Sequence, residues 1–166
     1  SVGGAPGPLP PGAVQRMTLG SGALHSEQNA SSEAPMRFIQ IWILPDTPGL
    51  APEVEQRVFT QQDRAGRLLR VIGPDGGDAV RVHQDATVHV AALAAGEEVV
   101  HPIGQGRGAY AYLIDGQARF DGQPAATGDA AKVTGPASLT VRAEAPSELI
   151  LVDVPMEFER VGVWAR

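Results

Sequence analysis

Two residues near the beginning of the chain, His25 and Glu27, are of the types that bind divalent metal ions. They lie two positions apart, so on a β-strand both side chains point to the same face, where an imidazole and a carboxylate can reach one ion. Two histidines and one carboxylate are the smallest facial set for the oxygen chemistry of non-haem iron. His25 and Glu27 therefore form half of a metal site, and an isolated pair of this kind also occurs by chance on exposed strands.

Other polar residues give weaker indications of chemistry. His83 and His89 lie six positions apart, but Gln84-Asp85 between them is expected to form a turn, so we interpret both histidines as structural. The segment Gly104–Gly108 is similar to a phosphate-binding loop, yet a predicted strand follows it and no helix N-terminus would face the phosphate. We interpret this segment as a flexible hairpin.

Short strands must position these residues. Val14–Leu19 and Ala23–Glu27 are predicted strands, the second of which carries the metal-site pair, and Arg37–Leu44 is predicted to be a core strand because it is rich in isoleucine and aromatic residues. Glu53–Asp63 has a mixed periodicity that fits either a helical turn or an extended segment. Eight further strands are predicted at Gly66–Ile72, Val80–His83, Thr87–Leu93, Ala109–Ile114, Gln117–Phe120, Ala130–Val133, Ser138–Ala143 and Glu148–Val154.

Turn chemistry between the predicted strands decides the fold class. The 166 residues include 20 glycines and 14 prolines, and Asp-Gly or Gly-Asp pairs punctuate the second half of the chain. No long segment with a 3.6-residue period exists to supply crossover helices. The sequence therefore predicts an all-β sandwich or jelly-roll barrel, with Phe38, Trp42 and Phe120 in its core.

The composition excludes several classes of function. An apolar fraction of 43% is too high for a disordered chain, and a net charge of -6 without a basic cluster argues against direct nucleic-acid binding. The longest apolar run, residues 86–95, is interrupted by His89 and is shorter than the roughly 18 to 20 residues of a membrane span. The absence of cysteine fits a reducing compartment. We expect a soluble, cytoplasmic protein without membrane contact.

Two landmarks in the first 45 residues carry a family resemblance. The run from Val14 to Glu27 (VQRMTLGSGALHSE) resembles the pirin signature, a Met-Thr-Ala-Gly-x-Gly sequence ending in His-Ser-Glu, and Gln40–Pro45 is similar to the Gln-x-Trp and proline that follow it. Further matches to the second cupin of pirins lie at Gln84–Ala86, Tyr112–Gly116, Gly128-Asp129 and Leu151–Pro155. The resemblance covers residues 13–155.

The resemblance implies two stacked cupin barrels of the jelly-roll type. In pirins the first barrel binds a divalent metal, usually iron, through three His and one Glu, and His25 and Glu27 match two of these ligands. The other two form a His-x-His pair upstream of Ser1, and a first residue other than Met indicates a cut or processed chain. We predict a tail over residues 1–12, the C-terminal portion of the first cupin over 13–45, a connecting segment over 46–78 and the second cupin over 79–166.

The second cupin is predicted to be free of metal, as in pirins. Counting back from Gly116, the ligands of the first cupin motif would fall near Pro102, Gly104 and Ala109, none of which can bind a metal. His101 is one position off and is expected on the opposite face of its strand. The histidine of the second cupin motif has no counterpart among residues 130–139.

These observations predict a pirin-like cupin protein with a partial metal site that is non-catalytic in this form. The alternative is a metal-dependent quercetin 2,3-dioxygenase-like oxygenase that uses iron or another divalent metal and a small aromatic substrate, if the native protein contains the upstream His-x-His pair. A regulatory module that binds a protein partner is also consistent with the resemblance. A halved first barrel would expose unpaired strand edges, so we also expect a homodimer or strand exchange.

Overall fold

The computed structural model describes residues 7–162 and 165. Within these residues twelve strands follow one another, and no α-helix interrupts them. The strands are β1 (Ala13–Thr18), β2 (Glu53–Val58), β3 (Leu69–Gly73), β4 (Val80–Arg81), β5 (Thr87–Leu93), β6 (Glu98–Ile103), β7 (Arg107–Asp115), β8 (Gln117–Phe120), β9 (Gln123–Ala126), β10 (Ala130–Thr134), β11 (Ala137–Ala143) and β12 (Ser147–Pro155). This arrangement confirms the all-β class.

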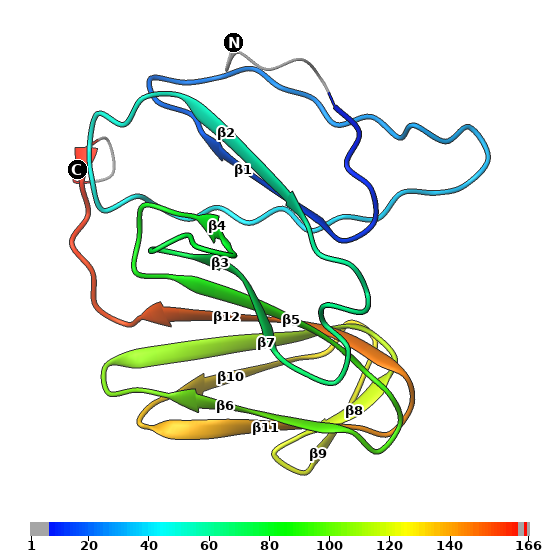
Figure 1. Cartoon of the computed structure of the whole chain (residues 1–166). Helices are drawn as coiled ribbons and strands as arrows, with labels where there is room; N and C mark the ends of the chain where they lie inside the picture. Colours follow the sequence, from blue (N-terminus) through cyan, green and yellow to red (C-terminus); the bar gives the residue numbers. More distant parts are fainter. Residues whose placement is uncertain (1–6, 163–164, 166) are drawn as a thin grey trace.

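Two sheets form the main body of the molecule. One has six strands in the order β10-β7-β12-β5-β3-β4, and the other has four strands in the order β6-β11-β8-β9. They pack face to face without hydrogen bonds that would close them into one continuous barrel (Figure 1). We call β3 to β12 the double sheet. It begins at Leu69, within the segment predicted as connecting, and includes the strands that the sequence predicted in the second half of the chain.

The core of the double sheet lies between its two layers. Every second residue of the central strand β12 points inward, and Leu149 and Leu151 are fully buried there. They pack with Leu113 of β7 and with Leu139 and Val141 of β11. Phe120 is 6% exposed, which confirms its prediction as a core residue.

Glycine at two turns is required by the local geometry. Asp121 and Gly122 connect β8 and β9, and both have positive φ angles of 47° and 81°, as in a type I′ hairpin turn. Gly116, between β7 and β8, has a φ of 103°, and a side-chain carbon there would collide with Pro146 and Ser147. The predicted Asp-Gly turns therefore fix where these strands end.

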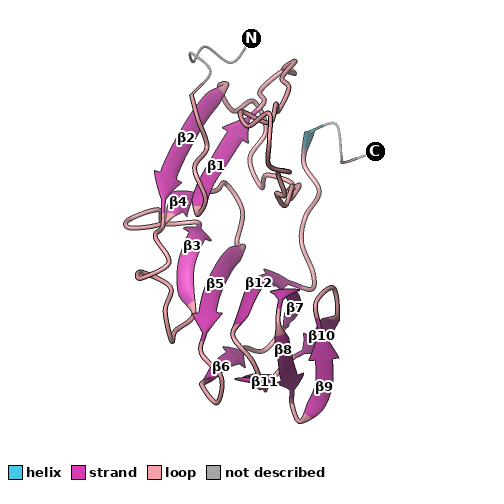
Figure 2. Ribbon diagram, turned by 90° about the vertical axis from the view of Figure 1, so that its right-hand side faces the viewer, coloured by secondary structure: helices cyan, strands magenta, loops and turns pink. Residues whose placement is uncertain are grey.

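A small second sheet packs at one end of the double sheet. β1 and β2 pair in antiparallel register from Ala13↔Val58 to Thr18↔Glu53, and Figure 2 shows this pair beyond β3 and β4. A second apolar cluster on the outer face of the six-stranded sheet joins the two parts, with Phe59, Val71, Val80 and Val88 at its centre. The undecided segment 53–63 thus contains a strand, and the segment predicted as connecting, 46–78, contains the whole of β2 and β3.

Two strand predictions between β1 and β2 are wrong. Residues 23–27 and 37–44 form no strand, and the segment from 19 to 52 runs as a long loop. Phe38 is 56% exposed and Trp42 is 75% exposed, so neither belongs to the core. An apolar, β-branched sequence becomes a strand only where another strand accepts its backbone hydrogen bonds, and among the described residues no strand pairs with this segment.

The sequence analysis also missed two strands in the double sheet. β6 contains Pro102 and β9 contains Pro124, and proline lowers the expectation of a strand. β6 and β9 lie at the two edges of the four-stranded sheet, where a missing N–H need not interrupt a ladder. No helix in the part of the chain that the structure describes is long and apolar enough to cross a membrane.

Candidate functional site

His25 and Glu27 lie together in the loop between β1 and β2. The Nε2 atom of His25 is 3.2 Å from Oε1 of Glu27, and the two side chains are 33% and 36% exposed. The segment is irregular rather than a strand, so the shared face of a strand is not what brings the pair together. The two donors nevertheless point to one another and remain accessible to solvent.

Local hydrogen bonds shape the loop just after this pair. The side-chain oxygen of Asn29 accepts a hydrogen bond from the N–H of Ser31 (3.0 Å), and its amide nitrogen donates to the carbonyl of Ala34 (2.7 Å). Ser31 Oγ accepts from the N–H groups of Glu33 and Ala34. These Asn and Ser turns order the backbone without a neighbouring strand.

The metal-site pair is a set of two donors. An imidazole nitrogen and a carboxylate oxygen suit iron, nickel or zinc, and they fit two positions of such an ion. Among residues 7–162 and 165, no group of three or more histidine, aspartate or glutamate side chains is arranged to hold a metal ion. His25 and Glu27 thus offer two donor atoms within hydrogen-bond distance of each other.

A second group of polar side chains extends from the inside of the double sheet to its surface, and the sequence analysis did not identify it. We call it the Arg107 cluster, consisting of Asp85, His89, His101, Arg107 and Asp153. Asp153 Oδ2 lies 2.7 Å from His101 Nε2, and Asp153 Oδ1 lies 2.6 Å from Arg107 Nε. Arg107 Nη1 donates to Asp85 Oδ2 at 2.7 Å, and the rings of His89 and His101 have centroids 5.1 Å apart.

The prediction that His101 faces outward is wrong. Val99, His101 and Ile103 alternate with exposed residues along β6, and Val99 and Ile103 belong to the core between the sheets. His101 therefore points inward, and its side chain is 11% exposed. The count back from Gly116 placed the inner face one residue too late, because it assumed a fixed spacing through the β6–β7 hairpin.

Strand ends and one loop bring the Arg107 cluster together. His89 is near the start of β5, Arg107 begins β7 and Asp153 is near the end of β12, where it is level with Thr87 and Ala109. Asp85 belongs to the loop before β5, which is anchored because Gln84 Nε2 donates to the carbonyl of Leu44 at 2.9 Å. Every second residue of β12 points inward, and Asp153 continues the series of Leu149 and Leu151. This alternation was the signal in the sequence for a buried aspartate.

Burial and charge set the protonation of this cluster. Desolvation first, and then the nearby His101 and Arg70 charges, lower the pKa of His89 to about 4, although Asp153 acts in the opposite direction. For Arg107, desolvation alone would lower the pKa, but the hydrogen bonds and charges of Asp85 and Asp153 outweigh it and raise the pKa. His89 is thus neutral at pH 7, and Arg107 is a cation held by two carboxylates.

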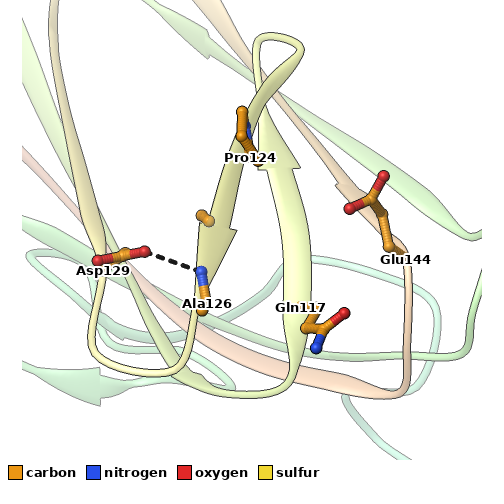
Figure 3. Close-up of a pocket in the computed structure, with 6 residues that line it drawn as sticks. Gln117, Pro124, Ala126, Asp129 and Glu144 are labelled. Atoms are coloured by element: carbon orange, nitrogen blue, oxygen red, sulfur yellow. Dashed lines mark hydrogen bonds between the residues drawn. The ribbon is translucent and has the colours of Figure 1, made fainter.

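An open hollow on the four-stranded sheet contains two more carboxylates. Asp129 Oδ2 accepts a hydrogen bond from the Ala126 N–H at 2.9 Å and closes the turn after β9 (Figure 3). Glu144, on the other side of the hollow, is paired with Arg119 at 2.6 Å. Both carboxylates are engaged in local structure, so this hollow offers no acid and base pair.

Comparison with known families matches the chain in two parts. Residues 70–154 match the family described as Quercetinase C-terminal cupin domain, and residues 2–43 match the family described as Pirin. The second match contains the metal-site pair. The first contains the whole Arg107 cluster.

Curated relatives are similar over most of this chain. A quercetin 2,3-dioxygenase of Escherichia coli (strain K12) is 34% identical over 148 residues, which are 89% of this chain and 63% of that protein. A pirin-like protein of Caulobacter vibrioides is 35% identical over 144 residues, which are 86% of this chain and 62% of that protein. The chain thus spans a little under two thirds of the length of these relatives.

Two solved structures share the fold. The crystal structure of YhhW from Escherichia coli has a TM-score of 0.64 and 30% identity, with 70% of this chain and 49% of that chain covered. The structure of the bacterial pirin YhhW in complex with nickel(II) has a TM-score of 0.62 at 30% identity, with 69% and 48% covered.

Proposed function

Because the chain belongs to the pirin family of cupin proteins, we propose that His25 and Glu27 supply two ligands of a divalent-metal site. The observation that carries this proposal is the 3.2 Å approach of His25 Nε2 to Glu27 Oε1 in the segment that matches the Pirin family. A histidine and a glutamate in direct contact, each about one third exposed, suit a shared ion that replaces their mutual contact.

The 166-residue chain by itself is proposed to be non-catalytic. Two ligands leave most positions of an ion to water, so a metal bound by this pair alone exchanges readily. A bound divalent metal in a complete site supplies Lewis-acid or dioxygen chemistry. What this chain contributes to such a site is one imidazole and one carboxylate in a loop that is ordered by Asn29 and Ser31.

The alternative function is an iron-dependent, quercetin 2,3-dioxygenase-like oxygenase acting on a small aromatic substrate. It requires that the native protein contain a His-x-His pair upstream of residue 1. The relatives named quercetin 2,3-dioxygenase support this alternative, since this chain is similar to 63% of the length of one of them. A cytoplasmic location remains a prediction of the sequence.

Metal titration tests the proposed ligand pair. Isothermal titration of the chain with Ni²⁺ or Fe²⁺ under anaerobic conditions should give weak binding, of about micromolar or higher Kd, that His25→Ala or Glu27→Gln abolishes. His83→Ala is the matched control and should bind as the unchanged chain does. Tight binding that survives His25→Ala would contradict the proposal. Extension of the chain to include an upstream His-x-His pair should raise the affinity and bring metal content to about one ion per chain if the oxygenase alternative holds.

We also propose that a second copy of the chain covers the apolar part of the β1–β2 loop. Phe38, Ile41 and Trp42 are 56%, 38% and 75% exposed, and they follow one another in a segment without a strand partner. An exposed apolar segment whose backbone pairs with no strand can accept a strand of another chain. This homodimer would supply the neighbour that residues 37–44 lack in a single chain.

Multi-angle light scattering tests the homodimer. The chain should elute with twice its mass of 17.3 kDa, and Trp42→Ser together with Phe38→Ser should shift it toward the monomer. Val100→Ser is the control, since Val100 is 53% exposed on the outer face of β6 and lies outside the proposed contact. A monodisperse monomer at every concentration would refute the homodimer.

A further inference from the structure

Arg107 holds two carboxylates that differ sharply in their surroundings. The Asp153 side chain is 6% exposed and comes from the central strand β12. The Asp85 side chain is 62% exposed and comes from the loop before β5. Arg107 itself is 24% exposed at the end of the double sheet where the β6–β7 hairpin lies, so solutes can reach its guanidinium from outside.

Asp153 is the fixed partner of Arg107. Its Oδ1 accepts from Arg107 Nε at 2.6 Å, and its Oδ2 lies 2.7 Å from His101 Nε2. The strand that carries it is hydrogen-bonded on both sides, to β5 and to β7. Arg107 and Asp153 together form a neutral pair that the core holds in place.

Asp85 is the replaceable partner. It reaches Arg107 Nη1 through one oxygen at 2.7 Å, and its loop is held by the separate bond from Gln84 to Leu44. Arg107 Nη2 makes only contacts of 3.5 Å to the carbonyl oxygens of Asp85 and Asp153, at the limit of hydrogen-bond geometry. The guanidinium therefore retains donor capacity on the side that Asp85 occupies.

His89 adds an unused polar atom beside His101 in the same cluster. Its Nδ1 is buried and has no hydrogen-bond partner among the described residues. Buried polar side-chain atoms in folded proteins almost always have a partner, so one without any requires an explanation. The ring of His89 lies 5.1 Å from the ring of His101, which Asp153 holds in place.

We propose that Asp85 occupies, as an internal stand-in, a binding site for a small carboxylate ligand on Arg107. A guanidinium fork matches the two oxygens of a carboxylate, and exchange of the Asp85 carboxylate for that of a ligand leaves the charge around Arg107 unchanged. This site uses residues of the second cupin alone and stands independently of the proposed metal site.

The attachment of Asp85 to the chain determines how strongly it competes with a free carboxylate for Arg107. A side chain tethered by a short loop acts at an effective concentration on the order of millimolar, so it suppresses the binding of weak free carboxylates. Removal of the Asp85 carboxylate should therefore tighten the binding of a free carboxylate by about tenfold or more. The loop should keep its place, because Gln84 still bonds to Leu44.

The experiment compares the chain with its Asp85→Ala variant at pH 7 and constant ionic strength. Sodium benzoate and sodium acetate are titrated while the ring C–H signals of His89 and His101 are followed by NMR. Asp85→Ala should bind benzoate at least about tenfold more tightly than the unchanged chain, with saturable shifts at the ring of His101, which Asp153 links to Arg107. Benzamide, which has the same shape without the charge, should produce no such shifts.

Matched variants decide the outcome. Asp75→Ala removes a carboxylate of nearly the same exposure, 64%, from its ion pair with Arg70, and it should bind benzoate as the unchanged chain does. Arg107→Lys in the Asp85→Ala background keeps the charge but loses the fork, and it should reverse the gain. The proposal is overturned if Asp85→Ala binds benzoate no better than Asp75→Ala, if no saturable binding occurs, or if benzamide binds equally well.

Discussion

The double sheet and the loop of residues 19–52 use similar apolar residue types but bury them to very different extents. Leu149 and Leu151 of β12 are fully buried between two layers, whereas Leu24 and Trp42 of the loop are 96% and 75% exposed. β12 has a hydrogen-bonded neighbour on each side, and the loop has none among the described residues. Strand formation in this protein thus depends on a partner strand more than on strand propensity.

One carboxylate in each of the two large ion-pair groups shows the same contrast, since Glu53 is exposed and Asp153 is buried. Arg16 on β1 bonds to Glu53 and Glu55 of β2, and the Glu53 side chain is 60% exposed. Arg107 on β7 bonds to Asp153, which is buried between the sheets. A solvent-exposed carboxylate of an ion pair contributes little to stability, whereas a buried one is costly to remove. The two regions should therefore respond differently to matched substitutions.

The largest expected difference concerns two leucines. Leu151→Ala should lower the free energy of unfolding by about 3 to 5 kcal/mol, because it leaves a cavity between β5, β7 and the opposite sheet. Leu24→Ala removes the same atoms, but from a side chain that is exposed to solvent, and should change the free energy of unfolding by less than about 0.5 kcal/mol. Urea denaturation measures both. Equal losses would show that Leu24 is buried in solution, although it is 96% exposed in the single chain and lies outside the proposed homodimer contact.

Two glycines give the next largest difference. Gly116→Ala should cost about 2 to 3 kcal/mol, since φ is 103° and a side-chain carbon would collide with Pro146 and Ser147. Gly49→Ala also meets a positive φ, of 71°, but with open space around it, and should cost about 1 kcal/mol. Thermal unfolding of the two variants checks the order. The reverse order would mean that the β7–β8 turn is free to rearrange.

Substitution of one carboxylate in each ion-pair group sharpens the comparison further. Asp153→Asn should cost about 2 kcal/mol, because Arg107 and His101 lose a buried charged partner. Glu53→Gln should cost about 0.5 kcal/mol or less, since its side chain is 60% exposed and Glu55 remains beside Arg16. A loss for Glu53→Gln as large as that for Asp153→Asn would contradict the distinction between the two regions.

The smallest effect is a pH dependence that arises from His89. Its pKa of about 4 in the folded chain is below the ordinary value of 6.5, so the unfolded chain binds a proton more readily. The resulting stability is fully present above about pH 6.5 and is lost as the pH falls to about 4. After solvent screening is allowed for, the loss should be about 1 to 2 kcal/mol.

Denaturation curves at pH 7 and pH 4.5 measure this effect. His89→Gln should reduce the dependence on pH, because glutamine does not titrate in this range, and His83→Gln is the matched histidine control. An unchanged pH dependence in His89→Gln would show that His89 is not the group responsible. NMR titration of the His89 ring measures its pKa directly.

Much of the double sheet could be predicted from the sequence. Thr87–Leu93 and Gln117–Phe120 are strands with the predicted bounds, because alternation and Asp-Gly turns are local signals that match the final structure. β6 and β9 escaped prediction because their prolines are tolerated only at a sheet edge, and edge position is a property of the assembled sheet. The family was also identifiable from the residues around His25.

The two candidate sites also differ in how much of each could be predicted from the sequence. The identity and spacing of His25 and Glu27 were evident in the sequence, but their contact arises in an irregular loop rather than on a strand. The Arg107 cluster joins residues that lie 68 positions apart at its extremes, from Asp85 to Asp153, and no local pattern relates them. The sequence by itself determined the all-β class, the turns and the family. Only the tertiary structure decided which apolar segments pair with another strand and which polar residues contact one another in the Arg107 cluster. Both depend on contacts between distant parts of the chain.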